Sequence, residues 1–145
     1  PELVAGTQQA DLVLGSRYVP GGGTRNWPWH RRALSSWGNR YVRAVTGVDV
    51  RDGTSGYRAF RRAVLEEIDL QALRSDGYSF QLETLLRSWR SGFVVDEVPI
   101  TFVERRAGTS KISRAIVLEA LWRVLRWGLA GPRRPEARHP RSVLA

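Results

Sequence analysis

The stretch from residue 111 to residue 129 restricts the fold more than any other part of this sequence, because a helix formed there is apolar on almost every side. One stripe of that helix consists of Leu118, Leu121, Trp122, Leu125 and Leu129, and the far side carries Ile116, Val124 and Trp127. The only polar strip is narrow and consists of Glu119, Arg123 and Arg126. These charges argue against a bilayer span, and each large apolar side chain left in water forgoes roughly 1.5–3 kcal/mol of burial. The helix must therefore be covered by the rest of the protein, by a partner or by a lipid surface.

Positive charge dominates the composition. The 145 residues include 23 lysines and arginines, of which Lys111 is the only lysine, against 14 acidic residues, and the formal net charge is +9. Such an excess favours an anionic partner, which leaves nucleic acid, an acidic membrane surface and phosphorylated substrates as candidates. The absence of cysteine excludes disulfides and thiolate chemistry, and the two histidines are far apart in sequence, which argues against a histidine-based zinc site. The length suits one domain or part of one.

Hydrophobic runs and glycine or proline punctuation predict a mixed α/β order. We expect the end of a helix at 1–9, a strand buried on both faces at 11–19, a loop at 20–28, and a helix at 29–46 that Gly47 ends. Mostly loop is expected at 48–60, a short helix at 61–67, and a helix within 75–92, capped by Ser or Asp and closed by Gly92. Residues 93–103 are β-rich, with Pro99 at an edge or bend, and a polar loop follows at 104–110. Residues 1–130 are thus the folded part, and the Pro- and Arg-rich residues 131–145 are predicted to be a disordered tail.

The helix predicted at 29–46 is amphipathic, with aromatic residues on its apolar side. At 100° per residue the apolar stripe consists of Leu34, Trp37, Tyr41 and Val45, and the polar side of Arg32, Ser36, Asn39, Arg40 and Arg43. Arg31 and Ser35 are four residues apart and share the border between the two sides. Two interpretations stay open: a helix lying on a membrane with tryptophans at headgroup depth, or an ordinary amphipathic helix with a solvated polar face.

Two loops carry residues suited to anion binding. "GSRYVPGGG" places Ser16 and Arg17 beside three glycines, where backbone N–H groups can approach an anion closely. "ERRAGTSK" sets Arg105, Arg106 and Lys111 around a flexible turn, as a diphosphate clamp requires. Each has an ordinary alternative, a hairpin loop and a solvated charged loop.

Two further segments group polar side chains. "RDGTSGYR" gathers Asp52, Thr54, Ser55 and Arg58, and "YSFQLE" places Gln81 and Glu83 on a short helical arc. Turn hydrogen bonds and a surface pair on a helix are the ordinary alternatives.

Taken together, in this order and spacing, the segments resemble one family. The signatures, which run from about residue 10 to residue 127, are "DLVLGSRYVPGG", "WPWHRRALSSWGN", "TGVDVRDGTSGYRAFRR", "DGYSFQLE", "GFVVDEVPITFVERRAGTSK" and the later "EAL". They resemble the C-terminal half of the catalytic domain of polyprenol (dolichol) monophosphate mannosyltransferases, in glycosyltransferase family 2. The resemblance implies a GT-A fold, which is a Rossmann-like α/β sandwich. It also implies inverting transfer of mannose from GDP-mannose to a membrane polyprenyl phosphate, at the cytoplasmic face of the membrane.

The resemblance also implies roles for individual residues. Arg17, Arg31 and Ser35 match the residues that bind the acceptor phosphate. Arg105 and Lys111 match the basic loop that contacts the donor diphosphate. Asp52, Gln81 and Glu83, together with Ser16, match residues that line the sugar and acceptor side, and Asp52 joins Arg105 and Lys111 as a candidate catalytic residue. The two amphipathic helices match interface helices that lie on the membrane, where a membrane-anchoring partner is a further candidate.

The nucleotide-binding half of the family, with its Asp-X-Asp metal motif, does not match any part of this sequence. The sequence is therefore expected to be a fragment, with the ligands for Mg²⁺ or Mn²⁺ outside it and no metal site of its own. Two alternatives stay open: a family 2 enzyme with another donor, such as a polyprenyl-phosphate glucosyltransferase, and a basic, aromatic module that binds a nucleic-acid single strand.

Overall fold

The structure, a computed structural model, describes residues 2–69, 73, 77–104 and 114–131. The predicted basic loop with Arg105 and Lys111, the predicted cap of the helix after residue 75, and the predicted tail at 132–145 lie outside these residues. In chain order the elements are α1 (Glu2–Gly6), β1 (Leu12–Ser16), β2 (Gly23–Arg25), α2 (Trp29–Thr46), β3 (Arg58–Phe60), α3 (Arg62–Glu67), α4 (Gly77–Arg90), β4 (Val95–Pro99), β5 (Thr101–Val103) and α5 (Arg114–Ala130). The predicted mixed α/β class is confirmed.

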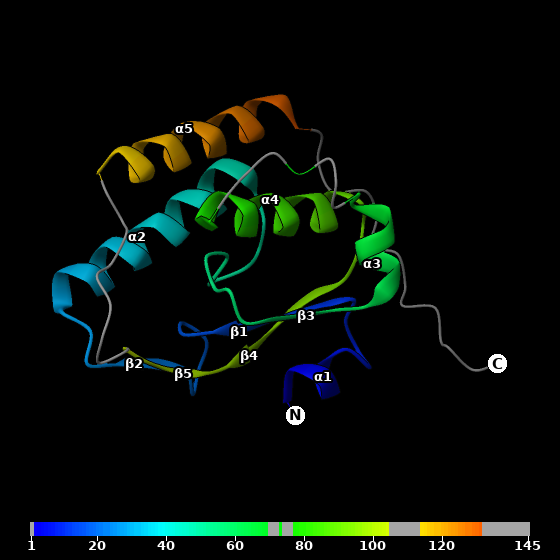
Figure 1. The fold of residues 1–145 in the computed structure, drawn as a ribbon, viewed down its shortest axis with the longest axis horizontal. Coiled ribbons are helices and arrows are strands. Elements are labelled where there is room, and N and C mark those ends of the chain that lie inside the picture. Colours follow the sequence, from blue (N-terminus) through cyan, green and yellow to red (C-terminus); the bar gives the residue numbers. More distant parts are fainter. Residues whose placement is uncertain (1, 70–72, 74–76, 105–113, 132–145) are drawn as a thin grey trace.

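Strand β1 is the centre of a three-stranded sheet in the order β3-β1-β4. It runs antiparallel to β3 and parallel to β4, with Leu12 opposite Val95 and Ser16 opposite Pro99. A second, two-stranded sheet joins β2 and β5 in parallel. Helices α2, α4 and α5 lie on one side of the larger sheet and α1 lies on the other (Figure 1).

The side chains of β1 alternate between two cores, as a period of two requires. Leu12 and Leu14 pack with residues of α2, α4 and α5, whereas Val13 packs with Leu3 of α1. All five residues of β1 are buried, which confirms the strand predicted to be covered on both faces.

The predicted boundaries of α2 agree with the structure, whereas two other predictions were wrong. Helix α2 covers the predicted residues, and Gly47 ends it in the left-handed conformation (φ 75°), with its N–H donating to the Arg43 carbonyl. The prediction of a loop at 20–28 was wrong for residues 23–25, which pair with β5 about eighty residues later. Asn39 was also misplaced: it is 2% exposed rather than on a solvated face, because its side chain bonds to the loop after α2.

Arg58 of β3 holds the loop at residues 51–56 against α4. Its guanidinium donates to the carbonyls of Gly53 (2.6 Å), Ser55 (2.7 Å) and Gln81 (2.6 Å), and to the Thr84 hydroxyl (3.1 Å). Burial lowers the pKa of Arg58 to about 10, and the charge of Asp52 acts in the opposite direction. A planar fork with several donors suits these four acceptors, and the single ammonium of lysine cannot reach all of them.

We therefore expect Arg58→Lys to lower the free energy of unfolding by roughly 3 kcal/mol, since it leaves buried acceptors without donors. Arg62→Lys is the matched control, because Arg62 is exposed and pairs with Glu66 one helical turn away. The control should change stability by a few tenths of a kcal/mol at most. Urea denaturation followed by circular dichroism measures both, and equal stability of the two variants would contradict this role of Arg58.

Candidate functional site: a pocket with a cationic end and an apolar end

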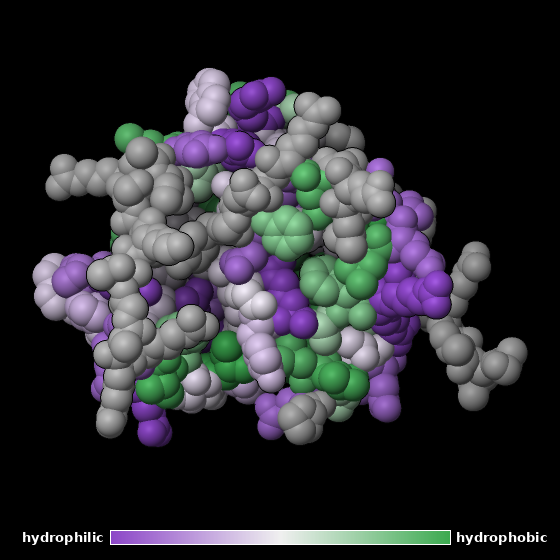
Figure 2. All heavy atoms as spheres, in the orientation of Figure 1, coloured by the Kyte–Doolittle hydropathy of each residue, from purple (hydrophilic) through white to green (hydrophobic). Residues whose placement is uncertain are grey.

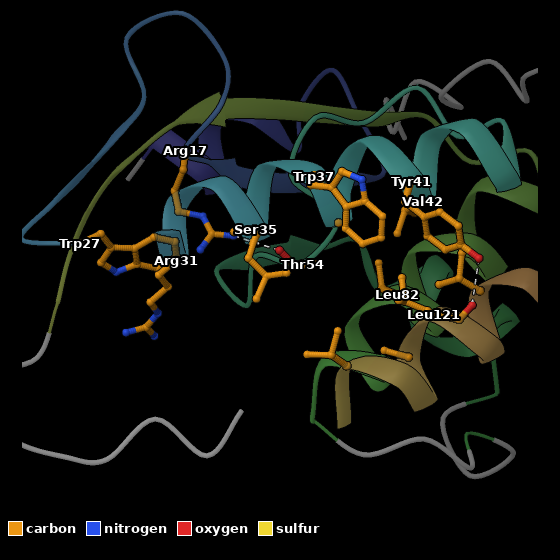
Figure 3. Close-up of a pocket in the computed structure, with 15 residues that line it drawn as sticks. Arg17, Trp27, Arg31, Ser35, Trp37, Tyr41, Val42, Thr54, Leu82 and Leu121 are labelled. Carbon is orange, nitrogen blue, oxygen red and sulfur yellow. Dashed lines mark hydrogen bonds between the residues drawn. The ribbon is translucent and has the colours of Figure 1, made fainter. Parts of the chain in front are cut away.

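A pocket of about 130 Å³ lies between α2 and α5. Its lining is mostly apolar and consists of Arg17, Trp27, Arg31, Leu34, Ser35, Trp37, Gly38, Tyr41, Val42, Thr54, Leu82, Val117, Ala120, Leu121 and Val124. Figure 3 shows that the polar and apolar residues are separated. Arg17, Trp27 and Arg31 gather at one end, Ser35 and Thr54 follow, and the aromatic and aliphatic side chains occupy the other end. Such a pocket suits an amphiphile with an anionic head.

At the polar end, Trp27 lies between the two arginines. The guanidinium carbon of Arg17 lies 5.0 Å from the centre of the Trp27 ring, and that of Arg31 lies 4.7 Å from it. These are distances at which a cation is attracted to an aromatic ring. Phe102 of β5 contacts the same tryptophan edge-on at 5.4 Å. The ring thus brings together two cations that are fourteen positions apart in sequence.

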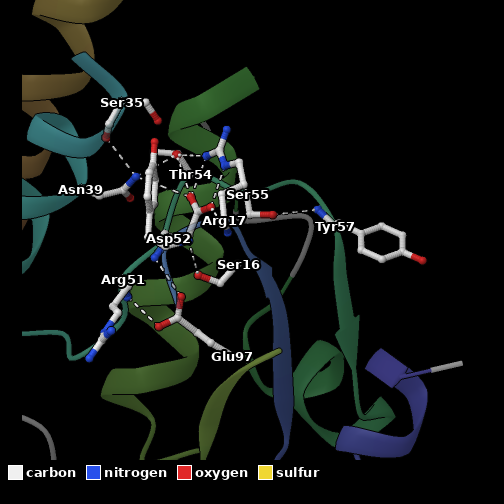
Figure 4. Close-up of polar contacts among 12 residues, drawn as sticks. Ser16, Arg17, Ser35, Asn39, Arg51, Asp52, Thr54, Ser55, Tyr57 and Glu97 are labelled. Carbon is white, nitrogen blue, oxygen red and sulfur yellow. Dashed lines mark hydrogen bonds and ion pairs between the residues drawn. The ribbon is translucent and has the colours of Figure 1, made fainter. Parts of the chain in front are cut away.

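The Arg17 side chain is anchored by a buried ion pair with Asp52, which is fully buried (Figure 4). One carboxylate oxygen of Asp52 accepts from the backbone N–H (3.0 Å) and Nε (2.7 Å) of Arg17, and the other accepts from its Nη2 (2.6 Å). Thr54 Oγ1 (3.2 Å) and Asn39 Nδ2 (3.5 Å) also donate to the second oxygen. This carboxylate is engaged on both oxygens, and Asp52 does not line the pocket. Its role in the structure is to position Arg17.

Glu97 of β4 positions Asp52 in turn. Its carboxylate accepts hydrogen bonds from the backbone N–H groups of Arg51 (2.6 Å) and Asp52 (2.9 Å). Because β4 pairs in parallel with β1, which leads directly into Arg17, the sheet fixes both ends of the ion pair. Sequence analysis missed Glu97, since a glutamate in a short strand carries no signal that it binds a loop almost fifty residues away.

Arg31 has a different partner. It forms an ion pair with Glu104, the last described residue before the predicted basic loop. The described segment therefore ends, at Glu104, beside the cationic end of the pocket. The Ser35 hydroxyl, one helical turn from Arg31 and also lining the pocket, forms no hydrogen bond with the described residues.

The structure brings together some of the predicted site residues and separates others. Arg17, Arg31 and Ser35 line one pocket, as a shared phosphate site requires. Ser16 is buried at the end of β1 and does not line the pocket, and its hydroxyl accepts from the backbone N–H of Tyr18 (3.3 Å).

The two residues predicted on α4 do not line this pocket. Glu83 is almost fully buried and pairs with Arg87 (2.6 Å), while the Gln81 side chain lies next to Gly56. The assignment of Gln81, Glu83, Arg105, Lys111 and Asp52 to the sugar and donor side stays a prediction.

Comparison with known proteins gives three related sequences. Polyprenol monophosphomannose synthase of Mycolicibacterium smegmatis is 54% identical over 122 residues, which make up 84% of this chain and 46% of that protein. Undecaprenyl-phosphate mannosyltransferase of Micrococcus luteus is 50% identical over 130 residues, 90% of this chain and 54% of that protein. Dolichol-phosphate mannosyltransferase of Pyrococcus furiosus is 33% identical over 133 residues, 88% of this chain and 36% of that protein. No protein-family model matches the chain.

The chain is therefore similar to part of three glycosyltransferases. Over most of its length it is similar to part of the polyprenyl-phosphate mannosyltransferases, which confirms the resemblance seen in the sequence motifs. The chain spans about half the length of the two bacterial relatives. Nothing in these comparisons favours the nucleic-acid-binding or glucosyltransferase alternative.

We expect Asp52→Asn to lower the free energy of unfolding by about 3–5 kcal/mol, because it leaves the mostly buried guanidinium of Arg17 without its counter-charge. Asp49→Asn is the matched control, since Asp49 is highly exposed and pairs with Arg43 only at 3.3 Å. That change should cost under about 1 kcal/mol. Chemical denaturation of both variants is the measurement, and a loss for Asp52→Asn no larger than that of the control would refute the anchoring role.

Proposed function

We propose that this pocket binds the acceptor, a polyprenyl phosphate, in a protein that transfers mannose to it. The observation that carries the proposal is the division of one pocket into a cationic end, with Arg17, Arg31 and Ser35, and an apolar end between α2 and α5. A polyprenyl phosphate is divided in the same way, since its anionic phosphate is followed directly by apolar isoprene units. The relatives are named after polyprenol, undecaprenyl phosphate and dolichol phosphate, and these names support this choice of acceptor.

The chemistry requires positioning more than proton transfer. A phosphate monoester is anionic at neutral pH, so its oxygen can attack the anomeric carbon of the mannose without a general base. A new bond forms between that oxygen and the carbon, while the bond from the carbon to the diphosphate oxygen breaks and its electron pair leaves with the nucleoside diphosphate. Attack from the opposite face inverts the configuration. Arginine pairs such as Arg17 and Arg31 suit the task of holding one anion near another.

The donor side of the proposal rests on the family resemblance. GDP-mannose is the proposed donor, Arg105 and Lys111 are the proposed contacts to its diphosphate, and a GT-A fold is the proposed frame. Mg²⁺ or Mn²⁺ would supply charge stabilisation for the leaving diphosphate. Within the described residues no three His, Asp or Glu side chains gather as a metal site would need. We therefore assign no step to residues of this chain through a metal.

We also propose that α2 and α5 rest on the membrane surface from which the lipid enters the pocket. No helix in the described ranges is long and apolar enough to cross a membrane. Three residues on the outward side of α5, Leu118 (66% exposed), Trp122 (61%) and Leu129 (80%), form an apolar stripe, and Trp29 at the start of α2 is 81% exposed. Hydrophobic and hydrophilic side chains adjoin along the edge that α5 forms (Figure 2). This pattern supports peripheral binding, for which we propose the cytoplasmic face and, as a further candidate, a membrane-anchoring partner.

Arg31→Ala and Ser35→Ala, made in the full-length protein, test the acceptor pocket. At subsaturating polyprenyl phosphate we expect Arg31→Ala to slow mannosyl transfer from GDP-mannose by about 10–100-fold, because one charge-assisted contact is lost. Ser35→Ala should have a smaller effect in the same direction. Arg32→Ala is the control, since Arg32 is exposed on the same helix and does not line the pocket. Unchanged rates for Arg31→Ala, with a preserved thermal midpoint, would reject the pocket as the phosphate site.

Replacing Leu118 and Trp122 together with glutamine tests the membrane surface. The unaltered protein should float with anionic phospholipid vesicles and remain partly bound at 1 M salt, because buried tryptophan and leucine supply a salt-resistant contribution. The double variant should be released by that salt. Val4→Gln is the control, because Val4 is 69% exposed but lies on α1, on the other side of the sheet (Figure 1). Complete release of the unaltered protein at 1 M salt would refute the proposal.

A further inference from the structure

Gly38 lies in the interior of α2 and lines the pocket. A glycine inside a helix destabilises it by roughly 0.5–1 kcal/mol relative to alanine, because the unfolded chain loses more freedom on folding. Two structural reasons commonly justify this cost. The backbone can need a positive φ, or a neighbour can approach too closely for a side chain.

Neither reason applies to Gly38. It is not among the positive-φ residues of the described chain, and a β-carbon built on it meets no atom of the described residues within 4 Å. Gly128 of α5 shows the contrast. A β-carbon there would lie 2.5 Å from Val45 Cγ1 and 2.6 Å from the Val45 carbonyl oxygen, so Gly128 lets α2 and α5 touch. Among the described residues, the space in front of Gly38 is therefore open.

The gap has a defined place along the pocket. Arg31, Ser35 and Gly38 occur at positions i, i+4 and i+7, so they follow one another along one side of α2. The step from Ser35 to Gly38 is roughly 4.5 Å along the helix axis, about the length of one isoprene unit. Beyond Gly38, Tyr41 donates a hydrogen bond to the Leu121 carbonyl (3.2 Å) and fixes the separation of α2 and α5. A lipid whose phosphate lies at Arg31 and Ser35 would therefore pass Gly38 with its first isoprene unit.

We propose that Gly38 determines acceptor specificity by leaving room for the methyl branch of the isoprene unit next to the phosphate. This inference rests on the proposed acceptor pocket. A linear alkyl chain is thinner than a branched isoprenoid chain, so it needs less of the gap. Side chains at position 38 should therefore exclude branched lipids before they exclude linear ones.

The test uses Gly38→Ala and Gly38→Val in the full-length protein, with binding of farnesyl phosphate, decyl phosphate and inorganic phosphate measured by calorimetry. Gly38→Ala should raise the thermal midpoint by about 2–4 °C, since it removes the helix penalty. Gly38→Val should weaken farnesyl phosphate binding about tenfold, weaken decyl phosphate binding much less, and leave inorganic phosphate binding unchanged. Gly23→Ala is the control, because a β-carbon there also meets nothing within 4 Å but Gly23 lies on β2, outside the pocket.

Arg31→Ala, measured with the same three probes, separates this inference from the proposed function. If Arg31→Ala weakens binding of all three and Gly38→Val leaves farnesyl phosphate binding intact, the inference fails and the acceptor pocket stands. Equal weakening of farnesyl and decyl phosphate by Gly38→Val also overturns the selectivity. If Arg31→Ala has no effect on any probe, the proposed function itself is wrong.

Discussion

The buried ion pair between Arg17 and Asp52 is the interaction on which the pocket depends. A charge removed from water must be compensated, and here five donors converge on one carboxylate while Glu97 holds the loop that carries it. The pair links the end of β1, the loop after α2 and, through Asn39, α2 itself. The cation at the pocket is thus fixed by segments far apart in sequence, as preorganised binding of an anion requires.

The two arginines of the pocket are held by opposite kinds of support. Asp52, which is fully buried, forms an ion pair with Arg17 and restricts the movement of its guanidinium. Arg31 pairs with Glu104, and both side chains of that pair are partly exposed, at 26% and 31%. An exposed pair contributes little stability, so on the proposed function a phosphate would displace Glu104 from Arg31 at small cost. The site therefore combines one rigid cation with one whose partner is exchangeable.

Local signals predicted much of this structure, and contacts between distant segments account for the rest. The boundaries of α2 follow from its apolar spacing and from Gly47. Arg17, Arg31 and Ser35, which the family motifs assigned to one phosphate site, line one pocket, and their binding of a phosphate stays a prediction. Helical periodicity placed Asn39 in solvent, because periodicity carries no information about the hydrogen bond that its side-chain amide donates to the buried carboxylate of Asp52. Strand β2 was missed for a similar reason: three residues rich in turn formers become a strand only because β5 pairs with them.

The preference of this chain for arginine over lysine has a structural reason at the pocket. Arg17 uses two nitrogens in parallel on Asp52 while its guanidinium carbon lies within 6 Å of the rings of Tyr18, Trp27 and Phe102. An ammonium has three donors, but it lacks the planar fork that places two of them in parallel on one carboxylate, and it has no planar surface to stack on the rings. It is also more strongly hydrated, so it costs more to bury. Arg58 makes the same use of the fork on four backbone and hydroxyl oxygens. A cation that is buried, bonded through several nitrogens and stacked on aromatic rings, as Arg17 is, therefore has to be an arginine.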